Sequence, residues 1–370
     1  MRSRAFVVLL LVVGVLASGC AKRTYDSEEV IDFIDATQPH SYRLDYTVTE
    51  GDTVVNVRGI VEDDFRYKLQ LALDEEPAAE QIVVDDGVAL RFLDTDLVEA
   101  FTDPAVEGEV DLETDVDGAT VFDALGAGRW VLDPSGAPNA VLTTLDAGND
   151  PDAPRDPMFD ARTALEYVRR VAESNTSPFK LYDPESLEPT YRSDEDPFPI
   201  PTASSGITRY DSVIADLPPP SAATSGDRTL PSARNFRKMA VYVKDDVIIE
   251  VREFIGVTPR QRDDFIEYVE RVVESTAGDE VLAAFRAEVE RLSDDDDALT
   301  EFVLGGINTF ITSTGAQPIR FREMSITISD LDEVTTRVRL PGDVITGDLA
   351  VIRNLGRKPL FDDTARAQGA

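Results

Sequence analysis

Alternating apolar and polar side chains mark the segment from Ser41 to Leu93 as a series of short β-strands. The clearest case runs from Phe65 to Leu73, where every second residue is aromatic or Leu and the others are Arg, Lys, Gln or Ala. A period of two is typical of a strand with one apolar face and one solvated face. We therefore predict five antiparallel strands in a meander, whose shared apolar face must be covered by helices, a ligand, or both.

Polar turn residues divide this segment. Glu50, Gly51 and Asp52 separate the first two predicted strands, and Asp86-Gly87 is a strong two-residue turn signal before the last one. Residues 75–80 predict a looser loop. Gly59 lies inside the second strand, where a glycine commonly marks a bulge or a bend.

Beyond this segment, stretches of helical periodicity alternate with stretches of strand periodicity. Asp26 is expected to open a helix as part of a capping box with Glu29, and Thr258 to cap a helix that begins at Pro259. Further helices are predicted over 160–173, 279–292 and 298–311, with a helical turn over 120–125. Further strands are predicted over 128–134, 207–217, 238–243, 247–254, 319–329 and 334–340, the last two as a pair. The proline-rich stretch 176–235 predicts a long loop.

The N-terminus has the pattern of an export signal. Arg2 and Arg4 precede an apolar run that ends in small residues and Cys20, and the run is too short to span a bilayer. The four residues that end this segment, Ala17 to Cys20, are similar to a bacterial lipobox, in which the cysteine is acylated and becomes the mature N-terminus. The alternative is a signal peptide with an incidental cysteine. We predict a signal peptide over 1–19, a lipidated tether over 20–25, and a lipid-anchored protein on the extracytoplasmic side of the cell membrane.

The charge balance is strongly acidic. The chain has 36 Lys and Arg against 71 Asp and Glu, a net charge of −35. Such a surface is repelled by phosphate backbones and by anionic head groups. Nucleic acid is therefore not a predicted partner, and membrane attachment is expected to come from the lipid on Cys20.

The residues for common kinds of catalysis are few. His40 is the only histidine and is expected at a surface boundary, and no G-x-S-x-G motif is present. With Cys20 acylated, the usual Cys and His zinc ligands are also missing. Asp294 to Asp297 predict a solvated loop that caps a helix, and Trp130 predicts a core residue. We predict no enzyme activity, no cofactor and no metal site.

The order of elements resembles the LolA-like lipoprotein-binding fold, most closely its LppX/LprG-type lipoprotein branch. The resemblance covers about residues 25–342. It rests on Cys20, the first helix, the strands from Ser41 through Asp85-Asp86-Gly87 to Leu93, the segment from Gly128 to Pro134, and the hairpin from Met239 to Phe254. It implies an α+β fold, a curved antiparallel β half-barrel with helices packed on its concave face, here with a helical insertion.

The same resemblance implies an apolar cavity that accepts acyl chains. Its lining would be drawn from Val55, Val57, Phe65, Tyr67, Leu69, Leu71, Leu90, Phe92, Val241 and Val243. We expect a single LolA-like domain over 26–342, with a proline-rich insertion over 176–235, a helical insertion over 258–314 and a C-terminal tail over 343–370.

Two functions remain open from the sequence. In the first, the anchored protein binds a lipid or a lipoprotein acyl chain for transport or display. In the second, the protein is a ligand-free envelope sensor or interaction module that regulates a membrane or cell-wall partner. Its own Phe265, Phe285 and Phe302 would then fill the cavity.

Overall fold

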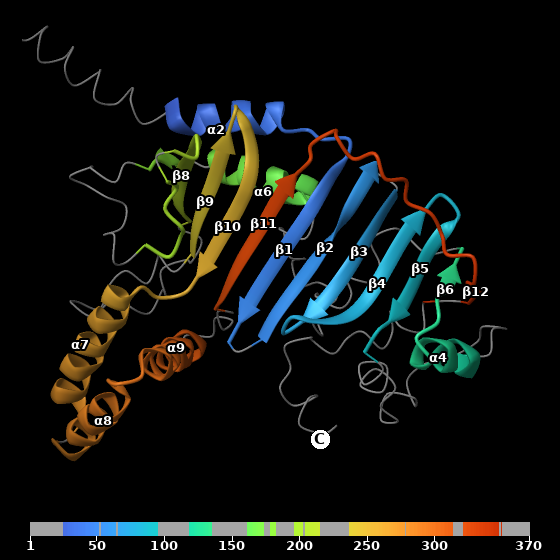
Figure 1. The fold of residues 1–370 in the computed structure, drawn as a ribbon. Helices are drawn as coiled ribbons and strands as arrows, with labels where there is room; N and C mark the ends of the chain where they lie inside the picture. The colour runs from blue at the N-terminus through green and yellow to red at the C-terminus, as the bar shows by residue number, and fades with distance from the viewer. Residues whose placement is uncertain are drawn as a thin grey trace, which may run out of the picture. The chain divides into compact units, whose positions relative to one another are not determined.

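In the part of the chain that the structure describes, six helices and twelve strands form an α+β fold in which antiparallel pairing dominates (Figure 1). The computed structural model describes residues 25–51, 53–63, 66–94, 118–134, 161–173, 178–182, 196–202, 204–214, 237–277, 279–313, 321–347 and 349. The strand order does not close on itself, so the sheet is open. No helix in these ranges is both long enough and apolar enough to cross a bilayer.

The chain divides into two compact units, each made of two stretches of sequence. Unit 1 contains residues 1–36 and 168–323, and unit 2 contains residues 37–167 and 324–370. Each unit is described by itself.

The sheet of unit 2 contains the predicted meander. Its strands are β1 (Tyr42–Glu50), β2 (Thr53–Asp63), β3 (Arg66–Leu73), β4 (Glu76–Val84), β5 (Gly87–Phe92), β6 (Val131–Asp133), β11 (Arg322–Ser329) and β12 (Ile345–Thr346), in the order β12-β6-β5-β4-β3-β2-β1-β11. The pairs from β1 to β6 are antiparallel, while β12 pairs with β6 in parallel. The five strands predicted between Ser41 and Leu93 are thus confirmed. Helix α4 (Gly118–Gly126) precedes β6.

Two of the turns between these strands differ from the prediction. The expected loop over 75–80 is a tight turn at Asp74 and Glu75, both with left-handed φ angles of 47° and 71°, and β4 already begins at Glu76. The last turn consists of Asp85 and Asp86, because Gly87 already pairs with Val84 as the first residue of β5. Glycine is needed there, since a Cβ atom would lie 2.3 Å from the carbonyl oxygen of Asp133.

Of the bulge or bend expected at Gly59, the bulge is wrong. Gly59 pairs in regular register with Leu44 on one side and Leu69 on the other. A Cβ atom at this position would lie 2.1 Å from the carbonyl oxygen of Lys68. The glycine therefore permits a close approach of β3, which is the second known reason for glycine inside a strand.

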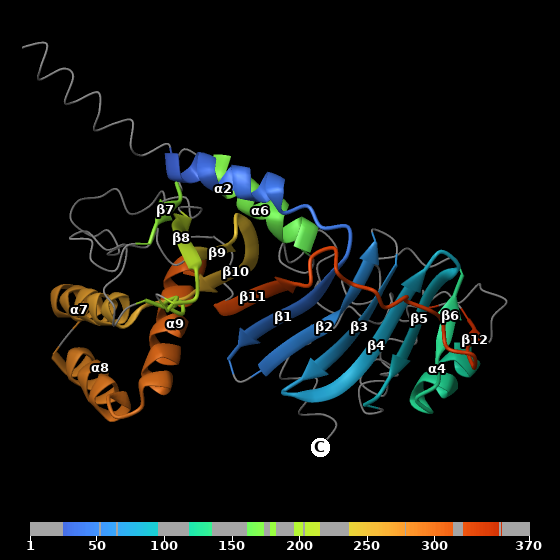
Figure 2. The same cartoon turned by 45° about the horizontal axis from the view of Figure 1, so that its top comes forward.

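The predicted strand over 334–340 is wrong, because these residues form no ladder with any described strand. They belong to residues 330–344, which we call the strap, and which cross the strands between β11 and β12 (Figure 2). Asp332 Oδ1 accepts hydrogen bonds from the backbone N–H groups of His40 (2.8 Å) and Ser41 (3.1 Å), and Glu62 Oε2 accepts one from Val338 N (3.0 Å). The apolar alternation of this stretch reflects packing on the sheet, without strand pairing.

In the described ranges, unit 1 contains four strands, paired in the order β10-β9-β8-β7. Its strands are β7 (Lys180–Leu181), β8 (Ile207–Ile214), β9 (Arg237–Lys244) and β10 (Val247–Ile255). Helix α2 (Tyr25–Ala36) packs on one face, with Phe33 5.7 Å from Tyr210 between ring centroids. Asp26 was expected to open this helix as its cap, but the helix begins at Tyr25, so Asp26 lies within the first turn, and its Oδ2 accepts a hydrogen bond from Leu181 N of β7 (3.2 Å). Helix α6 (Ala161–Glu173) lies at the boundary of the two units in the sequence.

Three further helices follow β10 in unit 1, and they match the predictions closely. They are α7 (Pro259–Thr276), α8 (Asp279–Leu292) and α9 (Asp296–Ser313). Thr258 caps α7 in a capping box with Gln261, and Asp295 Oδ1 accepts from Ala298 N (3.0 Å) at the start of α9. Phe265 packs with Val303 and Ile307 of α9, so these helices share a core of their own.

Candidate functional site

Seven of the ten predicted lining residues lie on one face of the unit 2 sheet. The cross-strand register places Val57, Leu71 and Phe92 in one row and Leu69 and Leu90 in the next. Paired residues point to the same face of a sheet. We call this the apolar face, and its predicted members are Val55, Val57, Tyr67, Leu69, Leu71, Leu90 and Phe92. None of the seven is more than 8% exposed.

The polar side chains on the apolar face include Gln81 and Asp133. Gln81 lies in the same row as Leu69 and Leu90 and is 1% exposed. Its Nε2 donates a hydrogen bond to Tyr67 Oη (3.2 Å), which satisfies part of the polar capacity that burial would otherwise leave unpaired. The sequence contains a sign of this residue, because Gln81 is polar but lies between Ala79 and Val83 on the apolar side of its strand. Asp133, at the sheet end, accepts from Leu349 N through Oδ2 (3.1 Å).

The other three predicted lining residues are placed differently. Val241 and Val243 belong to β9 in unit 1, where Val241 pairs with Tyr210, whose ring contacts Phe33 of α2. The face that carries them is therefore covered by a helix of the same unit. Phe65 lies outside the described residues, as does Cys20.

The opposite face of the unit 2 sheet carries charge, and we call it the charged face. Two adjacent cross-strand rows define it: Asp45, Arg58, Gln70, Glu80 and Arg91 in one, and Arg43, Ile60, Lys68, Ile82 and Ala89 in the other. Arg58 Nε lies 2.9 Å from Asp45 Oδ2, and Lys68 Nζ lies 3.6 Å from Glu80 Oε1. Arg91 shares the same Glu80 carboxylate.

Two hollows lie on the charged face. The larger, of about 470 Å³, is open to solvent and follows β1, β2 and β3 beside Thr327 and Ser329 of β11. The smaller, of about 290 Å³, lies between the sheet and the strap. Ile60 and Lys68 line both, so the two hollows adjoin. Trp130 lines the smaller one, with the Arg91 guanidinium 4.9 Å from its ring centroid.

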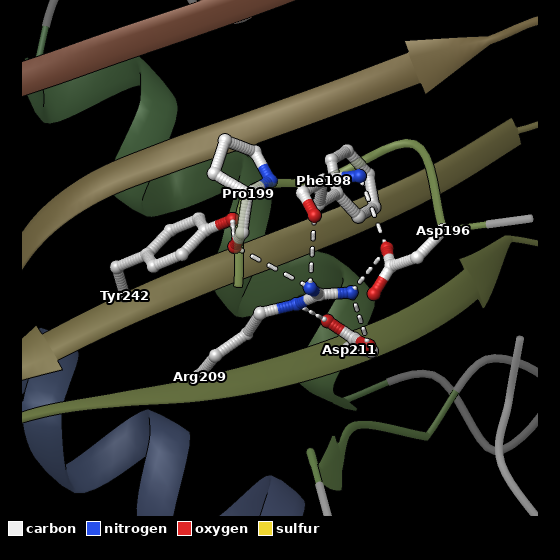
Figure 3. A network of polar contacts seen from close by, with 6 residues as sticks. All are labelled: Asp196, Phe198, Pro199, Arg209, Asp211 and Tyr242. Carbon is white, nitrogen blue, oxygen red and sulfur yellow. Dashed lines mark hydrogen bonds and ion pairs between the residues drawn. The ribbon is translucent and has the colours of Figure 1, made fainter. Parts of the chain in front are cut away.

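In unit 1, Arg209 is the centre of a buried polar cluster (Figure 3). Its guanidinium forms two hydrogen bonds with the Asp211 carboxylate (2.7 and 2.8 Å) and one with Asp196 Oδ1 (2.7 Å). Its Nη1 donates to the carbonyl oxygens of Phe198 (3.2 Å) and Pro199 (3.4 Å). All five guanidinium donors are thus used. The cluster fastens residues 196–199 to the sheet, and we assign it a structural role.

Burial dominates the electrostatics of this cluster. It raises the pKa of Asp211 to about 6, although the hydrogen bonds and charge of Arg209 act in the opposite direction. Burial also raises the pKa of Tyr182, whose ring lies 4.2 Å from the Arg209 guanidinium carbon. Burial raises the pKa of Tyr242 as well, and its hydroxyl donates to Pro199 O (2.8 Å). This cluster could not be predicted from the sequence, because Asp196 and Arg209 come from segments that only the tertiary fold brings together.

Comparison with known proteins adds no assignment. The chain matches no protein-family model and no curated protein. Among the described residues, no group of three or more His, Cys, Asp or Glu side chains is placed to hold a metal ion. The candidate site is therefore defined by the apolar face and its Gln81–Tyr67 pair.

Proposed function

We propose that this protein is a membrane-anchored lipoprotein that binds a hydrophobic ligand on the apolar face of unit 2, for transport or display. The ligand is a lipid or a lipoprotein acyl chain, and the curvature of a half-barrel with helices on its concave side is part of the proposal. The observation that carries it is the gathering of Val57, Leu71, Phe92 and their neighbours on one face across five consecutive strands.

The Gln81–Tyr67 pair adds a polar point to this surface. A ligand site for an acyl chain combines a large apolar wall with a few placed polar groups that fix orientation. An ester or amide at the head of an acyl chain has the hydrogen-bonding capacity to meet the Tyr67 hydroxyl or the Gln81 amide. We therefore place the polar end of the ligand at this pair, and its chain along Leu69, Leu71 and Leu90.

A second function is favoured by one specific observation. The seven side chains are at most 8% exposed, so other parts of the chain cover them. In the interaction module, this cover is permanent and the protein acts on an envelope partner through its outer surface. In the carrier, the ligand takes the place of part of the cover.

Mass spectrometry of the intact chain separates these functions. Denaturing spectra retain only covalent mass, including an anchor on Cys20, whereas native spectra also retain a bound ligand. The carrier predicts a native mass larger than the denatured mass by that of one lipid. Equal masses, together with no uptake of an added fluorescent fatty acid, would refute the carrier and favour the interaction module.

A matched pair of variants locates the ligand. Leu71→Arg and Gln70→Arg place the same side chain at adjacent residues on opposite faces of β3, since Leu71 is buried and Gln70 exposed. We expect the extra native mass to be lost only in Leu71→Arg. A thermal melt of both variants shows whether Leu71→Arg is still folded. If it is not, Val57→Phe is used in its place, because it fills the same row without adding charge.

A further inference from the structure

The charged face has a charge balance unlike that of the whole chain. Among the described residues, six cationic side chains line the two hollows, Arg43, Arg58, Lys68, Arg91, Arg337 and Arg339, together with two carboxylates, Asp45 and Glu80. Two more carboxylates lie nearby, Asp330 against Arg43 and Glu62 at the strap. Cations thus outnumber carboxylates here, while in the chain 71 acidic residues exceed 36 basic ones.

The carboxylates do not neutralise the cations of the smaller hollow. Lys68 and Arg91 share the single carboxylate of Glu80, which is 10% exposed at its side chain. Arg337 and Arg339 of the strap are exposed, and neither forms an ion pair with another described residue. Lys68, Arg337 and Arg339 therefore present excess positive charge around one opening.

The walls of the same hollow are apolar. Trp130, Ile60 and Leu340 line it beside the cations, and Val338 of the strap packs with Ile82, Ala89 and Trp130. The strap is fixed by Asp332 near its start and by Glu62 at Val338 in its middle, and after its end Ile345 N donates to Trp130 O (2.9 Å). The hollow is thus part of a fastened structure, with apolar walls and a cationic rim.

We propose that this hollow binds a phosphate ester with an apolar substituent. Arg337, Arg339 and Lys68 hold the phosphate, because guanidinium groups match phosphate oxygens in charge and fork geometry. The apolar part lies against Trp130, Ile60 and Leu340, and the adjoining larger hollow receives longer ligands. The site lies on the face opposite the proposed acyl site and does not depend on it. A soluble phosphate ester and a phospholipid head group share this chemistry.

Trp130 is the only tryptophan, so its fluorescence reports on this hollow directly. The full chain in a neutral detergent is titrated with hexyl phosphate, inorganic phosphate and hexanol. We expect hexyl phosphate to change the Trp130 emission with saturation, to bind at least tenfold more tightly than either fragment, and to bind more weakly as salt is added. No saturable change, or equal affinity for one fragment, overturns the proposal.

Variants test the role of the cations. The double variant Arg337→Gln/Arg339→Gln should weaken hexyl phosphate binding at least tenfold with an unchanged thermal midpoint. The control Arg271→Gln/Arg291→Gln removes the same charge from exposed positions on α7 and α8 and should bind like the parent chain. Equal binding by both double variants overturns the assignment of the phosphate to the strap.

Vesicles distinguish the two sources of the phosphate. The full chain is reconstituted in phosphatidylcholine vesicles with and without phosphatidylglycerol. A change in Trp130 emission only with phosphatidylglycerol, lost in Arg337→Gln/Arg339→Gln, identifies a lipid head group. If the Trp130 emission of the parent chain does not change with phosphatidylglycerol vesicles but hexyl phosphate still binds, the ligand is a soluble ester. A change with phosphatidylglycerol that persists in the double variant contradicts the proposed site.

Discussion

Replacing Arg209 with Met tests whether the buried cluster of unit 1 is held by charge. The side chains of Arg209, Asp196 and Asp211 are 0%, 2% and 1% exposed. Methionine has a similar length but no donors, so the variant leaves two carboxylates buried without their cation. Breaking a buried ion pair in this way costs about 3–5 kcal/mol. We expect the free energy of unfolding of Arg209→Met to be lower than that of the parent chain by about 3–5 kcal/mol at pH 8.

The loss should shrink on acidification. Without the cation, the pKa of Asp211 in the folded variant rises further above its ordinary range, because burial then acts without the opposing hydrogen bonds and charge of Arg209. An acid whose pKa is higher in the folded state than in the unfolded state loses stability as the pH rises, because the unfolded state releases its proton first. The penalty of Arg209→Met is therefore largest at pH 8 and smaller at pH 5, where the Asp211 carboxyl group binds a proton and stays buried as a neutral acid.

The loss of stability is measured by urea denaturation, with hydrogen exchange mass spectrometry as the probe of unfolding. Exchange in β8 and β9 reports on unit 1, whereas Trp130 fluorescence reports on unit 2. Arg271→Met, which removes an exposed i,i+4 pair with Glu267 on α7, is the control and should change stability by less than about 1 kcal/mol. A loss below 1 kcal/mol for Arg209→Met, or one that is equal at pH 5 and pH 8, refutes the reasoning.

Three further predictions concern the backbone. Gly59→Ala forces a Cβ atom against the carbonyl of Lys68 and should destabilise the chain by about 3 kcal/mol, whereas Gly305→Ala, in open space on α9, should stabilise it by about 0.5–1 kcal/mol in the same urea assay. Asp332→Ala should speed amide exchange in the strap while Asp332→Asn largely preserves it. Because the N–H groups of Ser41 and His40 lower the Asp332 pKa, the parent strap should also lose protection as the pH falls through that pKa. Thr258→Ala removes the α7 cap and should cost about 1 kcal/mol, and Thr276→Ala at the exposed end of α7 should cost less, as chemical denaturation can measure.

The strands and helices followed from local patterns because their determinants are local. The period of two in β3 and the cap at Thr258 each depend on residues a few positions apart, and the structure places both as predicted. The turn at Asp74 and Glu75 did not follow, because non-glycine residues rarely adopt left-handed φ angles. Asp245 and Asp246 share this conformation in the β9–β10 turn.

The candidate site could be predicted in part. The register from β2 to β5 brought Val57, Leu71 and Phe92 onto one face because alternation fixes which side chains share a side. The strap could not be predicted, because the alternation of Val338 and Leu340 is the same whether a segment pairs as a strand or only packs on a sheet. The excess of cations around Trp130 depends on Lys68 and Arg337, which only the tertiary fold brings together.

The division of unit 2 into two stretches of sequence affects how the protein must fold. Strand β1 pairs with β2 within a few residues, but its other neighbour, β11, begins only at Arg322. Until that residue has been synthesised, β1 has an open edge of backbone donors and acceptors, and the strap does not yet cover Trp130. Open strand edges promote aggregation, and closing so long a loop slows folding. We therefore expect chains truncated before β11 to aggregate, and the nascent protein to need protection along this edge until β11 has emerged.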